Sequence, residues 1–159
     1  MDAETLGNFD IFSGLSQRAL NGLTGVFQLR TAEKGEQIIT QGDISTGVFL
    51  IMSGIIEVIR ETRSGSRIPI HKIEPGVMFG TLSTIDGGKR GAHCIAQEKV
   101  EYAFMQKNDF LDLIEGESPM AMSFQVAVIR AIFKDLRDTN AQLAELSSLE
   151  PLDDMTPLS

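Results

Sequence analysis

Residues 48–60 read VFLIMSGIIEVIR, and this stretch decides the fold class. Residues 48–52 form a short apolar run, Ser53 and Gly54 supply a turn, and residues 55–60 partly alternate apolar and polar side chains. Such alternation is typical of a strand with one face buried and the other in water. The stretch therefore predicts two short strands separated by a glycine turn.

The same pattern extends from Phe27 to about Met105. Short runs rich in Val, Ile and Phe alternate there with glycine-containing turns. These turns lie at Lys34-Gly35, Gln41-Gly42-Asp43, Ser64-Gly65-Ser66, Pro75-Gly76 and Gly87-Gly88. No helical crossover separates the runs, which disfavours a parallel α/β sheet. Strands at this spacing predict an antiparallel sandwich or barrel-like roll.

Helical patterns lie on both sides of the expected roll. Ser16 can cap a short helix that carries Leu20 and Leu23 on one face. Asn108 can cap a second short helix, which is expected to end near Gly116. We expect the N-terminal helix to lie over the core.

A long helix is expected from about Pro119 to Leu146. Its apolar positions are spaced alternately by three and four residues, as in a coiled-coil seam. The seam consists of Ile129, Ile132, Leu136, Thr139, Leu143 and Leu146. The pattern predicts a dimerisation helix that pairs with a second copy of the chain. The alternative is an amphipathic helix packed only on its own domain.

The chain of 159 residues fits one domain of the α+β class. We expect this domain to span residues 1–146, with an antiparallel, jelly-roll-like β-roll at about 27–106 and C-terminal helices at about 108–146. Residues 147–159 contain two prolines and several acids. We expect them to form an acidic, disordered tail.

The charge balance excludes several classes of partner. The chain carries 22 Asp and Glu against 14 Lys and Arg, a net charge of -8, without a basic run. This balance argues against nucleic acid or an anionic membrane as the main partner. No apolar run approaches the roughly 20 residues that span a bilayer. One cysteine, Cys94, and the lack of a signal-peptide pattern favour a cytoplasmic protein.

Glycine and arginine come together between Phe79 and Arg90. Glycines let the backbone approach a ligand closely, and the planar fork of donors on Arg90 matches phosphate geometry. In an acidic chain the adjacent cations Lys89 and Arg90 are locally unusual. The stretch therefore predicts an anion-binding loop. The alternative is that Gly87-Gly88 forms only a hairpin turn with a solvated basic flank.

The order of these elements and the glycine positions resemble the cyclic nucleotide-binding domain family, including its cAMP receptor protein branch. The resemblance covers about residues 8–146. Gly35-Glu36 and Gly42-Asp43 are similar to the early roll signature of the family, and Phe49–Val58, with Ser53-Gly54 at the turn, is similar to its next hairpin. The resemblance implies a regulatory module that binds cAMP or cGMP as its ligand and uses no cofactor.

Phe79–Ala92 is similar to the phosphate-binding cassette of the family, in which backbone amides and an arginine hold the cyclic phosphate. The family's Gly-Glu-Leu reads Gly80-Thr81-Leu82 here, so a threonine replaces the glutamate that binds the ribose 2'-hydroxyl. The loss of a hydrogen bond worth roughly 1.5–3 kcal/mol implies binding weaker by one or two orders of magnitude. Thr84 and Asp86 are candidates to compensate. The resemblance assigns ligand contacts to Phe79, Gly80, Thr81, Leu82, Ser83, Arg90, Gly91 and Ala92.

The long helix offers a second set of contacts by resemblance. In the cAMP receptor protein branch, polar residues at this place read the base from both subunits of a dimer. The resemblance therefore makes Thr139 and Asn140 candidates for base contact. A polar pair in a heptad seam also serves to fix register, and this alternative stays open.

Catalytic chemistry is not supported by the side chains. The chain has only His71 and His93, no Ser/His/Asp set is evident, and Gly88-Lys89 lacks the other residues of a P-loop. We therefore expect no enzyme activity and no bound metal. Only thirteen acidic, proline-containing residues follow Leu146, so no DNA-recognition helix is expected. A free-standing sensor or adaptor is expected, with an unidentified protein partner that receives its signal.

Two functions remain open at this point. The first is a cyclic nucleotide sensor that acts through movement of the long helix, and Arg90 favours it. The second is a degenerate relative that binds no nucleotide and serves as a dimeric protein-interaction module, and Thr81 favours it.

Overall fold

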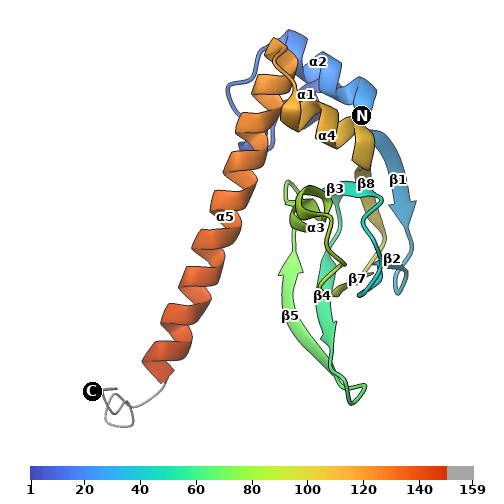
Figure 1. Ribbon diagram of the computed structural model, residues 1–159, viewed down its shortest axis with the longest axis vertical. Coiled ribbons are helices and arrows are strands. Elements are labelled where there is room, and N and C mark those ends of the chain that lie inside the picture. The colour runs from blue at the N-terminus through green and yellow to red at the C-terminus, as the bar shows by residue number, and fades with distance from the viewer. Residues whose placement is uncertain (150–159) are drawn as a thin grey trace.

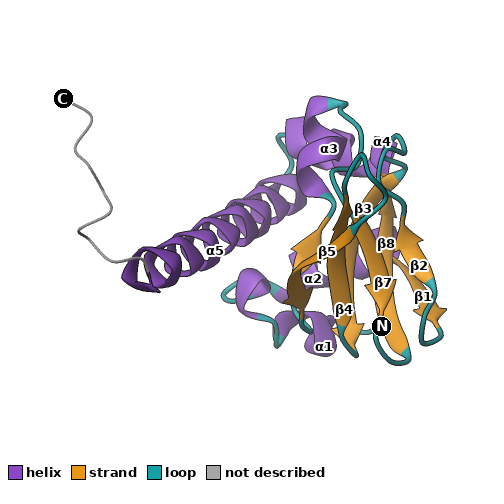
Figure 2. Cartoon of the chain, turned by 90° about the horizontal axis from the view of Figure 1, so that it is seen from below, coloured by secondary structure: helices purple, strands orange, loops and turns teal. Residues whose placement is uncertain are grey.

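The computed structural model describes residues 1–149, except the side chains of residue 142 and residues 146–149. In this part of the chain, two four-stranded antiparallel sheets form a roll, with strand orders β1-β8-β3-β6 and β2-β7-β4-β5 (Figure 1 and Figure 2). The strands are β1 (Gln28–Ala32), β2 (Gln37–Ile39), β3 (Gly47–Ser53), β4 (Ile56–Glu61), β5 (Arg67–Ile73), β6 (Met78–Phe79), β7 (His93–Ala96) and β8 (Val100–Gln106). The predicted α+β class and antiparallel β-roll are confirmed.

The helices gather mainly at one end of the roll (Figure 1). They are α1 (Ala3–Gly7), the 3₁₀ helix η1 (Asp10–Phe12), α2 (Gln17–Val26), α3 (Thr81–Asp86), α4 (Lys107–Glu115) and α5 (Pro119–Leu149). The predicted cap of α2 is confirmed, because Oγ of Ser16 accepts a hydrogen bond from the amide of Ala19 at 3.1 Å. The predicted cap at Asn108 is wrong. Strand β8 continues directly into α4, whose N-cap is Gln106, so Asn108 lies inside the first turn.

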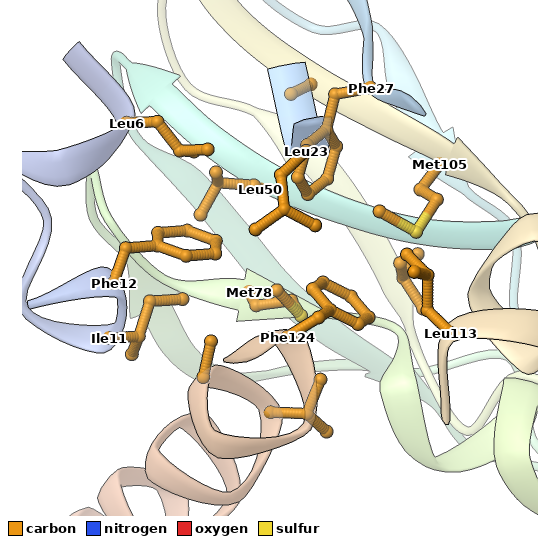
Figure 3. Packing of buried hydrophobic residues seen from close by; sticks show 14 of the residues in the cluster. Leu6, Ile11, Phe12, Leu23, Phe27, Leu50, Met78, Met105, Leu113 and Phe124 are labelled. Carbon is orange, nitrogen blue, oxygen red and sulfur yellow. The ribbon is translucent and has the colours of Figure 1, made fainter. Parts of the chain in front are cut away.

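The apolar run of β3 is buried on both faces of its sheet. Val48 and Leu50 belong to a core between this sheet and the helices, and Figure 3 shows Leu50 in this core together with Leu23, Met78 and Phe124. Phe49 and Ile51 belong to a second core between the two sheets. A strand covered on both sides needs apolar residues at successive positions, which explains the sequence pattern there.

The turn at Gly54 connects the two sheets instead of closing a hairpin, so the expected hairpin of residues 49–58 is wrong. Strand β3 pairs with β6 and β8, whereas β4 pairs with β5 and β7. Gly54 has φ +87°, and a Cβ there would lie 2.5 Å from the carbonyl oxygen of Lys99. Only glycine fits at this crossing. Any other residue would have a strained left-handed backbone conformation, and its Cβ would clash with the backbone of Lys99.

Helix α5 is anchored at its beginning and exposed further along. Phe124, Ala127 and Val128 are buried in the core beneath the helices. Beyond them α5 extends along the side of the roll (Figure 1). Beyond Val128, four described apolar side chains of this helix are each more than half exposed: Ile129, Phe133, Leu136 and Leu143.

The structure describes most of the predicted long helix but not the predicted C-terminal tail beyond Leu149. Helix α5 is described to Leu149, three residues past its expected end. The side chain of Leu146, the last seam position, and residues 150–159 of the expected tail lie outside the described part. Among the described helices, none is both long and apolar enough to cross a bilayer.

Candidate functional site

A cleft of about 520 Å³ brings together residues of the roll and of α5. Nine of the ten residues predicted to contact a ligand line it. They are Phe79, Gly80, Thr81, Leu82, Ser83, Arg90, Gly91, Ala92 and Thr139. Asn140, the tenth, is not among the lining residues. Two segments of the roll and one face of a distant helix therefore meet in the space that the sequence assigned to a ligand.

The guanidinium of Arg90 is the buried charge of this cleft. The residue is 6% exposed, and its Nη1 donates to the carbonyl of Gly80 and to Oγ of Ser83, both at 2.8 Å. Its Nη2 donates to the carbonyl of Gly47 at 2.6 Å. These bonds use three of the five N–H donors of an arginine, so two remain available.

Arg90 has no counter-ion within residues 1–149. No described carboxylate lies within ion-pair distance of it, and its three hydrogen-bond acceptors are neutral. Burial lowers the pKa of Arg90, but an arginine stays protonated at neutral pH. A buried charge is costly without an opposite charge nearby. An anion in the cleft would supply the opposite charge.

Gly80 connects β6 to α3, and both its backbone conformation and its close neighbours require glycine. Its φ is +78°, in the left-handed region, and it forms the N-cap of α3. A Cβ at this position would lie 2.6 Å from Nη1 of Arg90. The glycine thus lets the backbone approach the guanidinium, and the first amides of α3 follow without a side-chain cap.

The Thr84 hydroxyl secures α3 and does not compensate for the missing glutamate. It lies 2.7 Å from the carbonyl oxygen of Gly80 and 3.2 Å from that of Gly47, and it also contacts the hydroxyl of Ser45. Thr84 is fully buried. Its role is to hold the cassette against β3.

Thr81 is buried at the wall of the cleft. Its hydroxyl makes no hydrogen bond to another described residue, so it is free to serve a ligand there. A threonine supplies one neutral hydroxyl where the family has a carboxylate. Asp86 also lines the cleft, and one of its oxygens accepts the amide of Gly88 at 2.7 Å.

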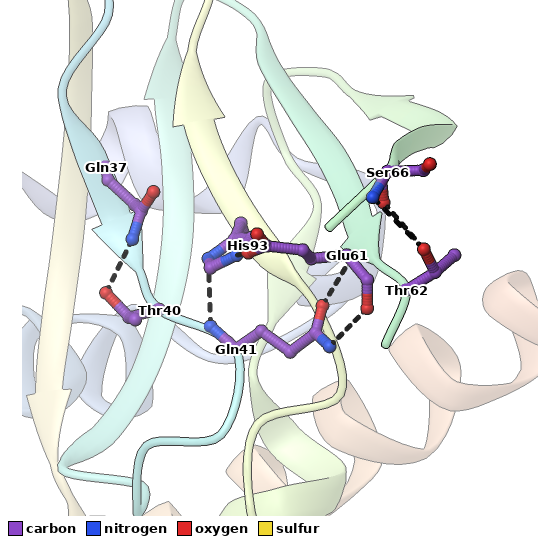
Figure 4. Close-up of polar contacts among 7 residues, drawn as sticks. All are labelled: Gln37, Thr40, Gln41, Glu61, Thr62, Ser66 and His93. Atoms are coloured by element: carbon purple, nitrogen blue, oxygen red, sulfur yellow. Dashed lines mark hydrogen bonds and ion pairs between the residues drawn. The ribbon is translucent and has the colours of Figure 1, made fainter. Parts of the chain in front are cut away.

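A polar network joins Gln41, Glu61 and His93 (Figure 4). The amide of Gln41 donates to Nδ1 of His93 at 3.0 Å, and Nε2 of His93 lies 2.9 Å from the Glu61 carboxylate. These contacts indicate a neutral His93 with its proton on Nε2. The hydrogen bond from His93 lowers the pKa of Glu61. The next residues, Gly42 and Asp43, exchange two hydrogen bonds of 2.8 Å with the backbone of Arg90.

The two adjacent residues His93 and Cys94 are both accounted for without a metal. His93 is engaged as described above. Cys94 packs in the core between the sheets, and burial raises the pKa of its thiol to about 12. Such a thiol carries almost no thiolate at neutral pH and is unsuited to nucleophilic attack.

Two cleft residues on α5 were missed from the sequence, namely Asp135 and Asp138. Asp138 and Thr139 follow Asp135 by three and four residues. Residues at these spacings lie on the same face of a helix. Helical spacing from Thr139 was the available signal. The family resemblance instead suggested the adjacent Asn140, which is not among the residues that line the cleft.

Comparisons with known proteins identify the family of the chain. The family model described as "Cyclic nucleotide-binding domain" matches residues 29–117. The Cyclic AMP receptor protein of Thermus thermophilus is 28% identical over 137 residues, which cover 86% of this chain and 62% of that protein. The chain thus spans less than two thirds of this relative.

Solved structures share the fold. A cyclic nucleotide-binding domain from Methylobacillus flagellatus superposes with a TM-score of 0.78 at 21% identity, covering 90% of this chain and 80% of that one. The regulatory domain of Toxoplasma gondii PKA, solved with cAMP, gives 0.66 at 19% identity, covering 79% and 48%. The matched family model spans more than half of the chain and contains the cleft residues from Phe79 to Ala92. The protein therefore belongs to the cyclic nucleotide-binding domain family.

Proposed function

We propose that the cleft binds a cyclic nucleotide, cAMP or cGMP, and that the protein acts as a regulatory sensor. The observation that carries this proposal is Arg90, a buried guanidinium with two free donors and no described counter-ion, in a cleft large enough for a nucleotide. The cyclic phosphate would supply the missing negative charge. Family membership and the cAMP bound to the Toxoplasma relative support the ligand class.

The cassette supplies the roles for phosphate binding. Arg90 would pair with the phosphate charge, and the amides of Leu82 and Ser83 at the start of α3 would donate to its oxygens. Gly80, together with Gly91 on the far side of the loop, keeps the approach free of side chains. Thr81 would offer one hydroxyl to the ribose.

Helix α5 is the element through which we propose that binding is signalled. The cleft is lined by the cassette and also by residues of α5, so a ligand that contacts both favours one placement of the helix over others. A ligand shifts such an equilibrium by the difference between its affinities for the two placements. The change would be passed to a protein partner.

A second copy of the chain is the partner that we propose for the exposed face of α5. Ile129, Leu136 and Leu143 are exposed and repeat every seven residues, so a coiled-coil seam would bury them. Ile132, another predicted seam position, instead packs partly against the core of its own domain. Pairing of this kind is also expected under the alternative function, in which the protein is an interaction module that binds no ligand. Thr81, which replaces the glutamate of the family, favours this alternative. The molecular mass of the assembly with and without nucleotide separates ligand-dependent from ligand-independent pairing.

Calorimetric titration with cAMP and with cGMP tests the proposal. Arg90→Leu removes the charge, but it also deprives the carbonyls of Gly80 and Gly47 of their donor, so its fold must be checked. Arg90→Lys keeps the charge and loses the planar fork. Arg18→Lys, an exposed position on α2, is the matched control.

We expect wild type and Arg18→Lys to bind alike, Arg90→Lys to bind at least tenfold more weakly, and folded Arg90→Leu not to bind. Equal affinity in all four proteins would contradict the assignment of Arg90.

A further inference from the structure

We infer that Arg60 is a second phosphate-binding arginine, which holds the cyclic phosphate from β4 while Arg90 holds it from the cassette. The inference rests on the proposed function, because it concerns the same cleft and the same ligand. It adds a binding residue from a strand outside the stretch from Phe79 to Ala92.

Strand β4 directs Arg60 into the cleft. Alternate residues of a strand lie on one face of the sheet, so Ile56, Val58 and Arg60 share a face. Ile56 and Val58 are buried in the core between the two sheets, whereas Arg60 is exposed. Val58 and Arg60 both line the cleft. Arg60 therefore extends the wall that the core residues form and adds a positive charge to it.

The guanidinium of Arg60 reaches the cassette. Its Nη2 lies 3.9 Å from the position that a Cβ would take on Gly91. Gly91 follows Arg90 directly in the chain and lines the cleft as well. Because Gly91 has no side chain, the space between the end of Arg60 and the backbone of the cassette stays open. A phosphate that contacts the cassette beside Gly91 would therefore meet Arg60 as well as Arg90.

Arg60 is not engaged by the described protein. Its guanidinium takes part in no hydrogen bond and no ion pair within residues 1–149. Asp86, Asp135 and Asp138 also line the cleft, but none of these carboxylates lies within ion-pair distance of Arg60. Because Arg60 is exposed, this lack of a partner costs little. Its five N–H donors remain available to a ligand.

A cyclic phosphate can use two guanidinium groups. It carries one negative charge, which is spread over the two oxygen atoms outside the ring. Arg90 retains two N–H donors after its bonds to the protein, and those of Arg60 are free. Hydrogen bonds between charged partners are stronger than neutral ones. Binding of one oxygen to each arginine would offset part of the affinity lost with the glutamate that Thr81 replaces.

Calorimetric titration with cAMP and with cGMP tests the role of Arg60. The variants are Arg60→Gln, which removes the charge, and Arg60→Lys, which keeps the charge without the planar fork. Arg63→Gln is the matched control, because Arg63 is exposed, does not line the cleft and gives the same change in net charge. The comparison separates a contact of Arg60 from the general attraction between a basic hairpin and an anion.

Phosphorothioate analogues of the better-bound nucleotide identify the atoms that Arg60 contacts. In the Rp and Sp analogues, a sulfur atom replaces one or the other of the two oxygens outside the ring, and sulfur is the weaker hydrogen-bond acceptor. Each analogue is compared with its parent nucleotide on wild type and on Arg60→Gln. A purely structural role of Arg60 would weaken all three ligands by the same factor.

We expect Arg63→Gln to bind like wild type, Arg60→Gln to bind about tenfold more weakly, and Arg60→Lys to lie between them. One of the two analogues should bind wild type more weakly than the parent does, and this difference should shrink on Arg60→Gln. Equal affinity of Arg60→Gln and Arg63→Gln, or equal weakening of the parent and both analogues, would overturn the inference while leaving nucleotide binding intact. No binding of either nucleotide to wild type would instead overturn the proposed function itself.

Discussion

Nη1 of Arg90 donates to the carbonyl oxygen of Gly80 at 2.8 Å, and a Cβ built on Gly80 would lie 2.6 Å from that same nitrogen. The glycine and the arginine therefore form one unit. The chain reverses at Gly80 with φ +78°, the guanidinium fills the space where a side chain would stand, and α3 begins there.

Replacement of Gly80 by alanine should damage both the fold and the site. A left-handed conformation costs a residue with a Cβ about 1–2 kcal/mol, and the clash displaces the guanidinium in addition. We expect Gly80→Ala to lower the free energy of unfolding by at least that amount and to weaken nucleotide binding. Urea unfolding and calorimetry measure the two effects.

Gly25→Ala provides the control for this substitution. Gly25 lies in α2, and a Cβ there has open space around it. Alanine should stabilise the helix by about 0.5–1 kcal/mol. If Gly80→Ala proved as stable as Gly25→Ala, the close approach of Gly80 to Arg90 would be refuted.

Thr81→Glu should restore the carboxylate that other members of the family use for the ribose. A hydrogen bond to a charged group is worth roughly 1.5–3 kcal/mol, which corresponds to a gain of about ten- to a hundredfold in affinity. Thr81→Gln, similar in shape but neutral, should gain less. Calorimetry with the preferred nucleotide measures both variants. An unchanged or weaker affinity in a folded Thr81→Glu protein would show that this position does not face the ribose.

Asp135→Asn should raise thermal stability at neutral pH by a small amount, because Asp135 stays partly exposed to solvent. Desolvation raises the pKa of Asp135 above its ordinary value of 3.8, so the folded state binds a proton more readily than the unfolded state. Stability therefore falls as pH rises from 3.8 through the raised pKa, and the penalty persists above it. The asparagine variant avoids this penalty.

Unfolding midpoints at pH 7 and near pH 3 check this sign. We expect Asp135→Asn to melt higher than wild type at pH 7, with the difference fading near pH 3, where the carboxyl is protonated in both states. Asp112→Asn, which changes an exposed acid in the middle of α4, serves as the control at both pH values. A variant that melts lower than wild type at pH 7 would show that the charged Asp135 stabilises the fold.

Leu136→Lys should prevent pairing through α5. Leu136 is 53% exposed in the single chain and lies in the middle of the proposed seam, where a buried lysine would be strongly unfavourable. Sedimentation equilibrium should give twice the chain mass for wild type and the single mass for Leu136→Lys. Lys134→Gln, which changes a neighbouring exposed residue without adding an apolar side chain, is the control. A wild type that sediments as a monomer at all concentrations would rule out the seam.

Local signals predicted the elements whose causes are local. The cap at Ser16 could be read from the sequence because its partner, Ala19, lies three residues away. The glycine turns and the apolar run at residues 48–52 likewise gave the roll. The hairpin at Gly54 was wrong because strand pairing is a long-range property: the two strands flanking this glycine find their partners at β8 and β5, outside the stretch itself.

The candidate site could likewise be predicted only where its features depend on nearby residues. The cassette is continuous in sequence, so Gly80 and Arg90 could be assigned from a motif. The environment of Arg90 depends on Gly47, which is 43 residues away. Asp135 and Asp138 depend on the rotation of α5 about its axis, which core residues such as Phe124 set at the far end of the helix. The periodicity of the sequence does not determine this rotation.

The structure of the protein bound to cGMP or cAMP is the measurement that tests the central claim most directly. The account predicts a cyclic phosphate in the cleft, with its oxygens about 2.7–3.2 Å from the free donors of Arg90 and from the amides of Leu82 and Ser83. A nucleotide bound elsewhere, or a cleft still without nucleotide at saturating concentration, would contradict it.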